Sequence, residues 1–161
     1  MAEAEDIIKQ FNLQPLEFEG GYFRQTYVSE NYCAGRPLST AIFYLITDEA
    51  KGFSRLHMLP IDELWHFYLG DPVKLLVLPE GKKGRQTILG RDVFNGQQLR
   101  YTVPAGTWQG ARLLPGGSWA LLGTTTVPGF LEKDFRVPDS DSLISRYPEW
   151  KEEITDLLWQ E

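Results

Sequence analysis

The sequence predicts an all-β domain, a barrel or sandwich of short strands, with short helices at its two ends. Between about Leu16 and Val127, short runs rich in Val, Ile, Tyr, Phe, Trp and Thr alternate with Gly, Pro, Asp and Asn at intervals typical of hairpins. Helical spacing of apolar residues occurs before this region and after Gly129. Such a series of short strands favours a closed or two-layered β architecture.

The N-terminal helix is predicted from Glu3 to Phe11, because Ala4, Ile7, Ile8 and Phe11 recur at helical spacing and acids occupy the first turn. Runs of strand-forming residues separated by turn residues then follow. The predicted strands are Gly21 to Val28, Thr40 to Ile46, Phe53 to Leu59, Glu63 to Leu69, Val73 to Leu78, Gln86 to Leu89, Gln98 to Val103, Trp108 to Leu113 and Trp119 to Thr126.

The C-terminal region returns to a helical pattern. Residues Asp139 to Tyr147 begin with side chains that cap helices, and Pro148 to Trp159 opens with proline at a first helical position. The chain shows no internal repeat and no linker-like change of composition. We therefore expect one domain over residues 1–161, with the barrel at about 16–130 and C-terminal helices at about 139–159.

The overall composition restricts the class of partner. A formal net charge of −6 and a pI near 5.0 oppose binding to nucleic acid, which requires clustered Lys and Arg. The acidic N-terminus lacks the features of a signal peptide, and no apolar run reaches membrane-spanning length. Cys33 is the only cysteine, so no intrachain disulfide forms. We expect a cytoplasmic protein that binds neither nucleic acid nor membranes.

Candidate catalytic residues are concentrated between Gly52 and Gly70, which contain both histidines of the chain. If His57 and Glu63 face inward from successive strands, they meet, with Arg55 nearby to hold an anion. A neutral imidazole acts as base or metal ligand, and the carboxylate orients it. The alternative is a structural, hydrogen-bonded polar pair. His66 has the opposite strand parity from Glu63, which favours a structural role.

Other side chains in the same region are candidates for lining a ligand pocket. Regular alternation places Phe53 on the same face as Arg55 and His57, and it places Trp65 and Phe67 on the same face as Glu63. Aromatic residues at strand spacing serve as core, as pocket wall, or as both.

Two segments resemble the conserved motifs of cupins. His57, Glu63 and Gly70 have the spacing of the first motif, although Gly52 is one residue too close to His57. The segment from Pro104 to Gln109 resembles the second motif, Pro-x-Gly followed by two residues and a histidine. The resemblance implies a jelly roll, the double-stranded β-helix of cupins, enclosing one small-molecule pocket.

A more specific resemblance is to the DUF985 or Cupin_5 family of small cupins. It covers most of the chain from about Gly20 onward, and it implies a cupin fold without supplying a substrate. The segments that carry it are GGYFRQTY (20–27), STAIFYLI (39–46), FSRLH (53–57), DELWHFYLGDP (62–72), VPAGTWQGARL (103–113) and VPGF (127–130).

The ligand set of metal-binding cupins is incomplete in this sequence. Such sites use two histidines and a glutamate from the first motif and a histidine from the second, and here Leu59 and Gln109 occupy two of those four places. No cofactor is therefore predicted. A divalent metal, held by His57, Glu63 and Gln109, remains an alternative, although this donor set is poor for Zn, Fe or Ni.

The resemblance also offers a metal-free precedent, the cupin epimerases of sugar nucleotides. There a histidine is the base and a tyrosine the acid, which implies His57 as base and Tyr22, Tyr44 or Tyr68 as acid. Arg24 or Arg55 would hold an anionic substrate group.

We therefore expect a small-molecule-binding cupin with metal-independent, epimerase- or isomerase-like chemistry on a small polar or sugar-like metabolite. The alternatives are a non-catalytic ligand-binding protein and a metal-dependent cupin. The resemblance also implies a homodimer that pairs through an N-terminal strand such as Gly21 to Val28. The predicted catalytic residues are His57, Glu63 and Arg55, and the predicted ligand-binding residues are Tyr22, Arg24, Phe53, Trp65, Phe67 and Gln109.

Overall fold

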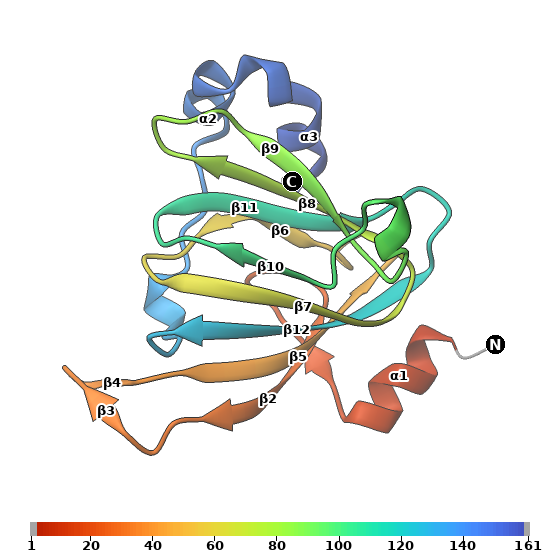
Figure 1. Ribbon diagram of the computed structural model, residues 1–161, viewed down its shortest axis with the longest axis vertical. Coiled ribbons are helices and arrows are strands. Elements are labelled where there is room, and N and C mark those ends of the chain that lie inside the picture. Colours follow the sequence, from red (N-terminus) through yellow and green to blue (C-terminus); the bar gives the residue numbers. More distant parts are fainter. Residues whose placement is uncertain (1–2, 160–161) are drawn as a thin grey trace.

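Two antiparallel sheets face each other across a shared interior (Figure 1). The computed structural model describes residues 3–159, so positions 1–2 and 160–161 of the predicted domain lie outside the described residues. The elements are α1 (Ala4–Phe11), β1 (Gln14–Pro15), β2 (Tyr22–Val28), β3 (Tyr32–Cys33), β4 (Arg36–Pro37), β5 (Thr40–Thr47), β6 (Ser54–Met58), β7 (Asp62–Gly70), β8 (Val73–Pro79), β9 (Arg85–Leu89), η1 (Val93–Asn95), β10 (Arg100–Val103), β11 (Thr107–Leu113), β12 (Trp119–Val127), η2 (Glu132–Asp134), α2 (Ser140–Arg146), η3 (Pro148–Trp150) and α3 (Lys151–Asp156).

The larger sheet has the strand order β1-β2-β5-β12-β7-β10, and the smaller sheet has the order β6-β11-β8-β9. Strands β3 and β4 form a separate hairpin that projects beyond β2 and β5 (Figure 1). Most neighbours in each sheet are not consecutive in sequence, as β12 between β5 and β7 illustrates. This crossed connectivity closes the two sheets into the predicted jelly roll.

The predicted all-β class is confirmed, and each predicted strand is present with small shifts of its ends. The largest shift is in β10, which begins at Arg100 rather than Gln98. The sequence did not reveal β1, β3 and β4, which are only two residues long. The predicted last helix is divided into the 3-10 turn η3 and the helix α3, which ends at Asp156.

Three apolar clusters hold these layers together. The main cluster fills the space between the sheets and includes Trp65, Leu75 and Val77. A second cluster joins the outer face of the smaller sheet to α2 and α3, through Leu56, Leu143 and other residues. A third packs α1 against the outer face of the larger sheet. No helix among residues 3–159 is long and apolar enough to cross a membrane.

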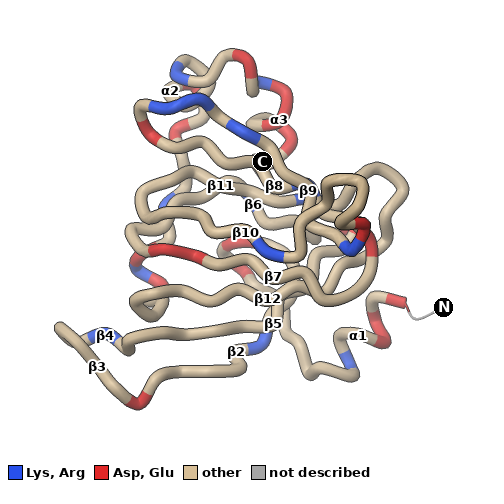
Figure 2. The backbone as a smooth tube through the Cα atoms, in the orientation of Figure 1, with Lys and Arg blue, Asp and Glu red and all other residues tan. Residues whose placement is uncertain are grey.

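Positive charge gathers at one end of the molecule. Figure 2 shows lysines and arginines along the β8–β9 hairpin, next to the C-terminal helices. The hairpin includes Lys82 and Lys83, which lie in its exposed turn. This basic segment is on the smaller sheet, whereas the cavity described below opens within the larger one.

A tight turn before β2 depends on two glycines. Gly20 and Gly21 have φ angles of 106° and 66°, values that favour glycine. A Cβ atom on Gly20 would also collide with the carbonyl oxygen of Phe53. The turn lies against the edge of β6, where the Arg55 amide donates a hydrogen bond of 3.1 Å to the Glu19 carbonyl. This contact holds Glu19 beside the interior of the barrel.

Candidate functional site

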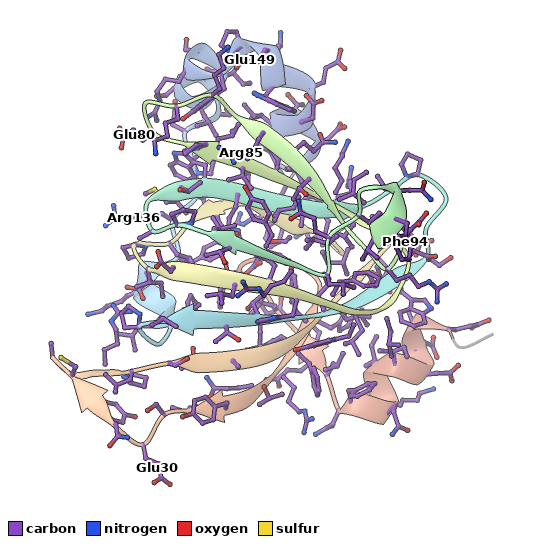
Figure 3. The ribbon with its side chains drawn as sticks, in the orientation of Figure 1. Glu30, Glu80, Arg85, Phe94, Arg136 and Glu149 are labelled. Atoms are coloured by element: carbon purple, nitrogen blue, oxygen red, sulfur yellow. The ribbon has the colours of Figure 1, made fainter. Side chains whose placement is uncertain are left out.

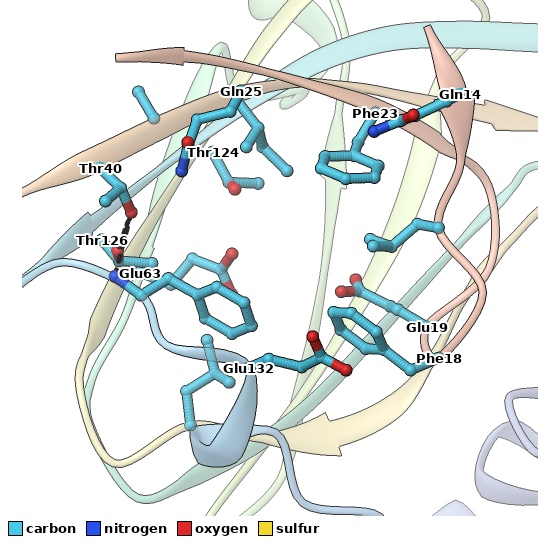
Figure 4. Close-up of a pocket in the computed structure, with 15 residues that line it drawn as sticks. Gln14, Phe18, Glu19, Phe23, Gln25, Thr40, Glu63, Thr124, Thr126 and Glu132 are labelled. Atoms are coloured by element: carbon cyan, nitrogen blue, oxygen red, sulfur yellow. Dashed lines mark hydrogen bonds between the residues drawn. The ribbon is translucent and has the colours of Figure 1, made fainter. Parts of the chain in front are cut away.

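A pocket of about 380 Å³ lies against the inner face of the larger sheet (Figure 4). Its walls are the inner faces of β2, β5, β7 and β12, together with segments 14–19 and 130–132. The lining combines aromatic, hydroxyl, amide and carboxylate groups. The residues are Gln14, Leu16, Phe18, Glu19, Phe23, Gln25, Thr40, Ala41, Ile42, Leu59, Glu63, Thr124, Thr126, Phe130 and Glu132.

One rim of the pocket is fixed by a forked ion pair. Arg36 donates from its two terminal nitrogens to the Asp134 carboxylate at 2.6 and 2.9 Å, and also to the Gly129 carbonyl at 2.8 Å. These hydrogen bonds from Arg36, opposed by burial, lower the pKa of Asp134 below its ordinary value. Because Asp134 closes η2, the pair fixes the position of Phe130 and Glu132 at the rim.

Glu63 is held by a chain of buried polar groups. The Trp65 indole N–H donates to Gln109 Oε1 at 2.8 Å, and Gln109 Nε2 donates to Glu63 Oε2 at 2.7 Å. An indole only donates, so the Gln109 oxygen must face Trp65 and its amino group must face Glu63. Gln109 therefore orients the Glu63 carboxylate, which is 7% exposed and lines the pocket.

His57 lies behind Glu63 rather than in the pocket wall. Its Nε2 is 3.9 Å from Glu63 Oε2, and its ring stacks on Phe135 with centroids 4.7 Å apart. A carbonyl only accepts, so His57 Nδ1 carries a proton and donates to the Arg55 carbonyl at 2.8 Å. Burial disfavours the charged ring, but Glu19, Glu63 and this carbonyl prevail and raise the pKa of His57 to about 8.

A β-bulge determines which residues of β6 face inward. Gln109 pairs with His57 and Ala111 pairs with Ser54, so the register shifts between them. Ser54 and His57 therefore share the inner face. The expected alternation fails here, and Phe53 packs instead in the apolar cluster beneath the C-terminal helices.

Glu19 is a second carboxylate of the site, and the sequence analysis missed it. Its Oε1 accepts a 2.6 Å hydrogen bond from Ser54, and the side chain points into the cavity (Figure 4). Burial raises the pKa of Glu19, and Glu63 adds to this effect while His57 opposes it. Glu19 lies in a turn without strand periodicity, so the one available signal was its position before the Gly20-Gly21 pair.

The three tyrosines considered as acids occupy different environments. Tyr44 is fully buried next to Glu19, and its hydroxyl donates to the Gly20 carbonyl at 2.8 Å. Tyr22 donates instead to Glu49 at 2.9 Å. Tyr68 is 48% exposed and stacks on His66, whose Nε2 is 3.2 Å from the Thr125 hydroxyl. Tyr44 is the one of the three that joins the site.

None of the six predicted ligand-binding residues is among the residues that line the pocket. Trp65, Phe67 and Gln109 lie in the interior behind the wall, because the core between the sheets fills that space. Tyr22 and Arg24 lie on the opposite side of β2, where Tyr22 packs near α1 and the Arg24 guanidinium lies over Phe43. Phe53, as noted above, faces away from the cavity.

Of the predicted catalytic residues, Glu63 alone lines the pocket. The Arg55 guanidinium lies 4.1 Å from the ring centre of Trp159 and 5.7 Å from that of Phe135, outside the lining. None of the described residues that line the pocket is lysine or arginine. The expected arginine anchor for an anionic substrate is therefore not part of this cavity.

The residues that occupy the four metal-ligand places of cupins do not fit the metal centre that the fold implies. Gln109 Oε1 accepts the Trp65 hydrogen bond and is directed away from Glu63, and Leu59 offers no donor atom. Within residues 3–159, no group of three or more His, Cys, Asp or Glu side chains has the geometry to hold a metal ion. One imidazole and one oriented carboxylate are a weak donor set for a transition metal.

Comparisons with known proteins give the fold and family but no reaction. A hypothetical protein from Leishmania major is 28% identical with a TM-score of 0.87, over 99% of this chain and 100% of that one. A protein from Shewanella oneidensis is 29% identical with a TM-score of 0.88, over the whole of both chains. No curated protein matches.

More distant similarity is to oxalate decarboxylase from Bacillus subtilis. The TM-score is 0.54 at 15% identity, over 89% of this chain and 36% of that one, a likeness of fold alone. The family model of the cupin superfamily described as DUF985 matches residues 5–138. Together with the paired sheets and the motif residues around His57, this match shows that the chain belongs to the Cupin_5 (DUF985) family of cupins.

Proposed function

We propose that this protein binds a small, polar, sugar-like metabolite and catalyses metal-independent proton transfer on it, as an epimerase or isomerase does. The observation that carries the proposal is the pair of carboxyl side chains, Glu19 and Glu63, directed into one pocket. Aromatic faces from Phe18, Phe23 and Phe130 beside hydroxyl and amide groups suit a ring that is apolar on its faces and polar at its edge.

The two carboxylates have complementary roles in this proposal. Glu63 takes a proton from a carbon next to the carbonyl group of the substrate. Glu19, whose pKa is raised by burial, acts from its protonated form and gives that proton to the carbonyl oxygen as the enol forms. For the isomer, Glu63 returns its proton to the former carbonyl carbon while Glu19 takes the proton of the neighbouring hydroxyl group. For the epimer, water gives a proton to the opposite face of the original carbon, Glu19 takes back its proton from the enol oxygen, and Glu63 releases its proton to water. Protons and electrons balance without a cofactor.

His57 acts in this proposal as a positioning residue. It is 1% exposed, and its positive charge behind Glu63, which is lost as the pH rises through about 8, keeps that carboxylate oriented. His57→Asn should therefore shift the pH profile of turnover as well as its rate, whereas a purely structural loss would lower activity equally at all pH values.

A deuterium exchange experiment tests catalysis directly. The protein is incubated in D₂O with pools of sugars and other polar carbonyl metabolites, and deuterium at carbon is followed by mass spectrometry. We expect exchange into one class of metabolite, loss of exchange in Glu63→Gln, and retained ligand-induced thermal stabilisation in that variant. Stabilisation without exchange in the unaltered protein would instead identify a non-catalytic binding protein.

We further propose that two copies pair through β2. Strand β1 covers only its first two residues, Tyr22 and Phe23, and the remainder of β2 is exposed along its outer edge, with Tyr27 54% exposed. Open strand edges of this kind pair readily with a second chain. Light scattering should give twice the chain mass, and Thr26→Pro, which removes a donor from this edge, should give a folded monomer.

A further inference from the structure

The pocket is acidic as well as polar. Glu63 and Glu132 contribute carboxylates to its lining, Glu19 adds a carboxyl group, and the lining contains no basic side chain among the described residues. Figure 4 shows Glu19 and Glu132 on the same side of the cavity, with Phe18 close to both. An anionic ligand would have to approach these carboxylates without a compensating cation, which is unfavourable at short range.

Part of this negative charge is unmatched. His57 lies behind Glu63 and balances its charge, and burial favours the neutral form of Glu19 by raising its pKa. Glu132 makes no ion pair or side-chain hydrogen bond with any residue in 3–159. Glu132 is therefore the carboxylate for which the protein supplies no partner.

The buried part of the pocket also has a free acceptor. Glu63 is more than nine-tenths buried, and its Oε2 accepts from Gln109. No hydrogen bond to its other oxygen, Oε1, comes from the described residues, and the side chain points into the cavity (Figure 4). This oxygen is therefore available to a donor group of a ligand in the pocket.

Aromatic faces lie beside these carboxylates. The rings of Phe18 and Phe130 both line the pocket and stack with centroids 6.2 Å apart at 16°. An ammonium group is stabilised by aromatic faces and by carboxylates together, whereas a neutral hydroxyl gains little from the former. The combination of an unpaired carboxylate, a carboxylate oxygen open to the cavity and an aromatic wall is that of a site for a protonated amine.

We propose that the ligand of this pocket carries a protonated amino group, as an amino sugar does, and that Glu132 selects it over neutral and anionic ligands. This inference rests on the proposed function, which gives a sugar-like ligand, and it specifies that the ligand is positively charged. The amino group lies near Glu132 and the Phe18 and Phe130 rings, and the hydroxyl groups reach Glu63 and the threonines of β12.

The test uses three probes with one ring and three charges: glucosamine, glucose and glucuronate. Binding to the full-length protein is measured by calorimetry at low ionic strength. We expect glucosamine to bind about tenfold more tightly than glucose, equivalent to about 1.4 kcal/mol. Glucuronate should bind most weakly. The preference for glucosamine should shrink as salt is added, because Glu132 is exposed.

Matched variants locate the effect. Glu132→Gln removes the unpaired charge and should reduce the preference for glucosamine over glucose severalfold. Glu149→Gln removes the same charge from η3, beside the C-terminal helices (Figure 3), and should leave the preference unchanged. Equal responses of the two variants would overturn the proposal.

The other outcomes separate this inference from the proposed function. Glucose or glucuronate binding as tightly as glucosamine would overturn the amine selectivity and leave a sugar-binding pocket. Absence of binding by all three probes would overturn the inference and would also remove the sugar-like ligand from the proposed function.

Discussion

The interior between the two sheets has a solid half and a hollow half. Near β8 and β11 the inward positions carry Val73, Leu75 and Val77, which are almost fully buried and fill the space. Near β2 and β12 the inward positions carry Gln25, Thr124 and other polar groups, and the space between them is the pocket. The same strand geometry thus yields core where side chains are bulky and apolar, and a cavity where they are short or polar.

Stability and ligand binding therefore depend on different halves of this barrel. Apolar area removed from water is concentrated in the solid half and beneath the C-terminal helices. The hollow half contributes carboxylates and hydroxyls whose burial is unfavourable without partners. We therefore expect substitutions in the solid half to lower the free energy of unfolding, and substitutions in the hollow half to weaken ligand binding.

The largest effect is expected from truncation in the solid half. Leu75→Ala should lower the free energy of unfolding by about 3 kcal/mol, because Leu75 is 0% exposed and the vacated space cannot collapse. Thr124→Ala, at a 6% exposed position on the pocket wall, should cost less than about 1 kcal/mol. Urea unfolding of both variants measures the contrast, and similar losses would contradict the division into two halves.

A smaller effect is expected at the rim of the hollow half. Asp134→Asn should cost about 2 kcal/mol, because it breaks the fork with Arg36. The pKa of Asp134 is lowered in the folded protein, so its contribution is present above the ordinary value of 3.8 and is lost as the pH falls through the lower folded value.

The control for the rim is an exposed pair of the same charges on the solid side. Arg146 and Glu80 are 3.9 Å apart with exposed fractions of 48% and 84%, so Glu80→Gln should change the free energy of unfolding by less than about 0.5 kcal/mol. An acid-unfolding midpoint that stays the same in Asp134→Asn would show that the rim pair contributes nothing.

The smallest of the three effects is the pH dependence of stability that arises from His57, which lies behind the pocket wall. The pKa of His57 is raised to about 8 in the folded protein. The contribution of protonated His57 to the free energy of unfolding is therefore fully present below the ordinary pKa of 6.5, and it is lost as the pH rises through about 8. We expect a loss of about 1 to 2 kcal/mol across this range. The measurement is the urea midpoint as a function of pH, and His57→Asn should remove this slope. An equal slope in the variant would assign it to other groups.

Sequence periodicity predicted the strands and much of what they bury. Alternation along β7 correctly placed Glu63, Trp65 and Phe67 on one buried face. The same reasoning was wrong for Phe53, because the bulge in β6 exchanges faces. No glycine or proline within β6 marks the bulge, and the glycine opposite it, Gly110, belongs to β11. Register shifts of this kind depend on the partner strand, which lies far away in the sequence.

The residues that line the pocket were harder to predict from the sequence. Glu19 and Glu132 lie in a turn and in the short η2 segment, where no period relates a residue to the interior. Their positions are set by distant contacts, the Gly20 approach to Phe53 and the Arg36 pair with Asp134. A charge in a connecting segment looks the same in the sequence whether it faces solvent or a cavity.

The hydrogen bond from Trp65 to Gln109 has an optical consequence. Indole emission responds to charge and hydrogen bonding around the ring, and Trp65 is fully buried, two hydrogen bonds from the pocket through Gln109 and Glu63. A ligand that engages Glu63 perturbs this chain from its far end. With the other four of the five tryptophans replaced by phenylalanine, the intrinsic fluorescence of Trp65 becomes a label-free signal of occupancy.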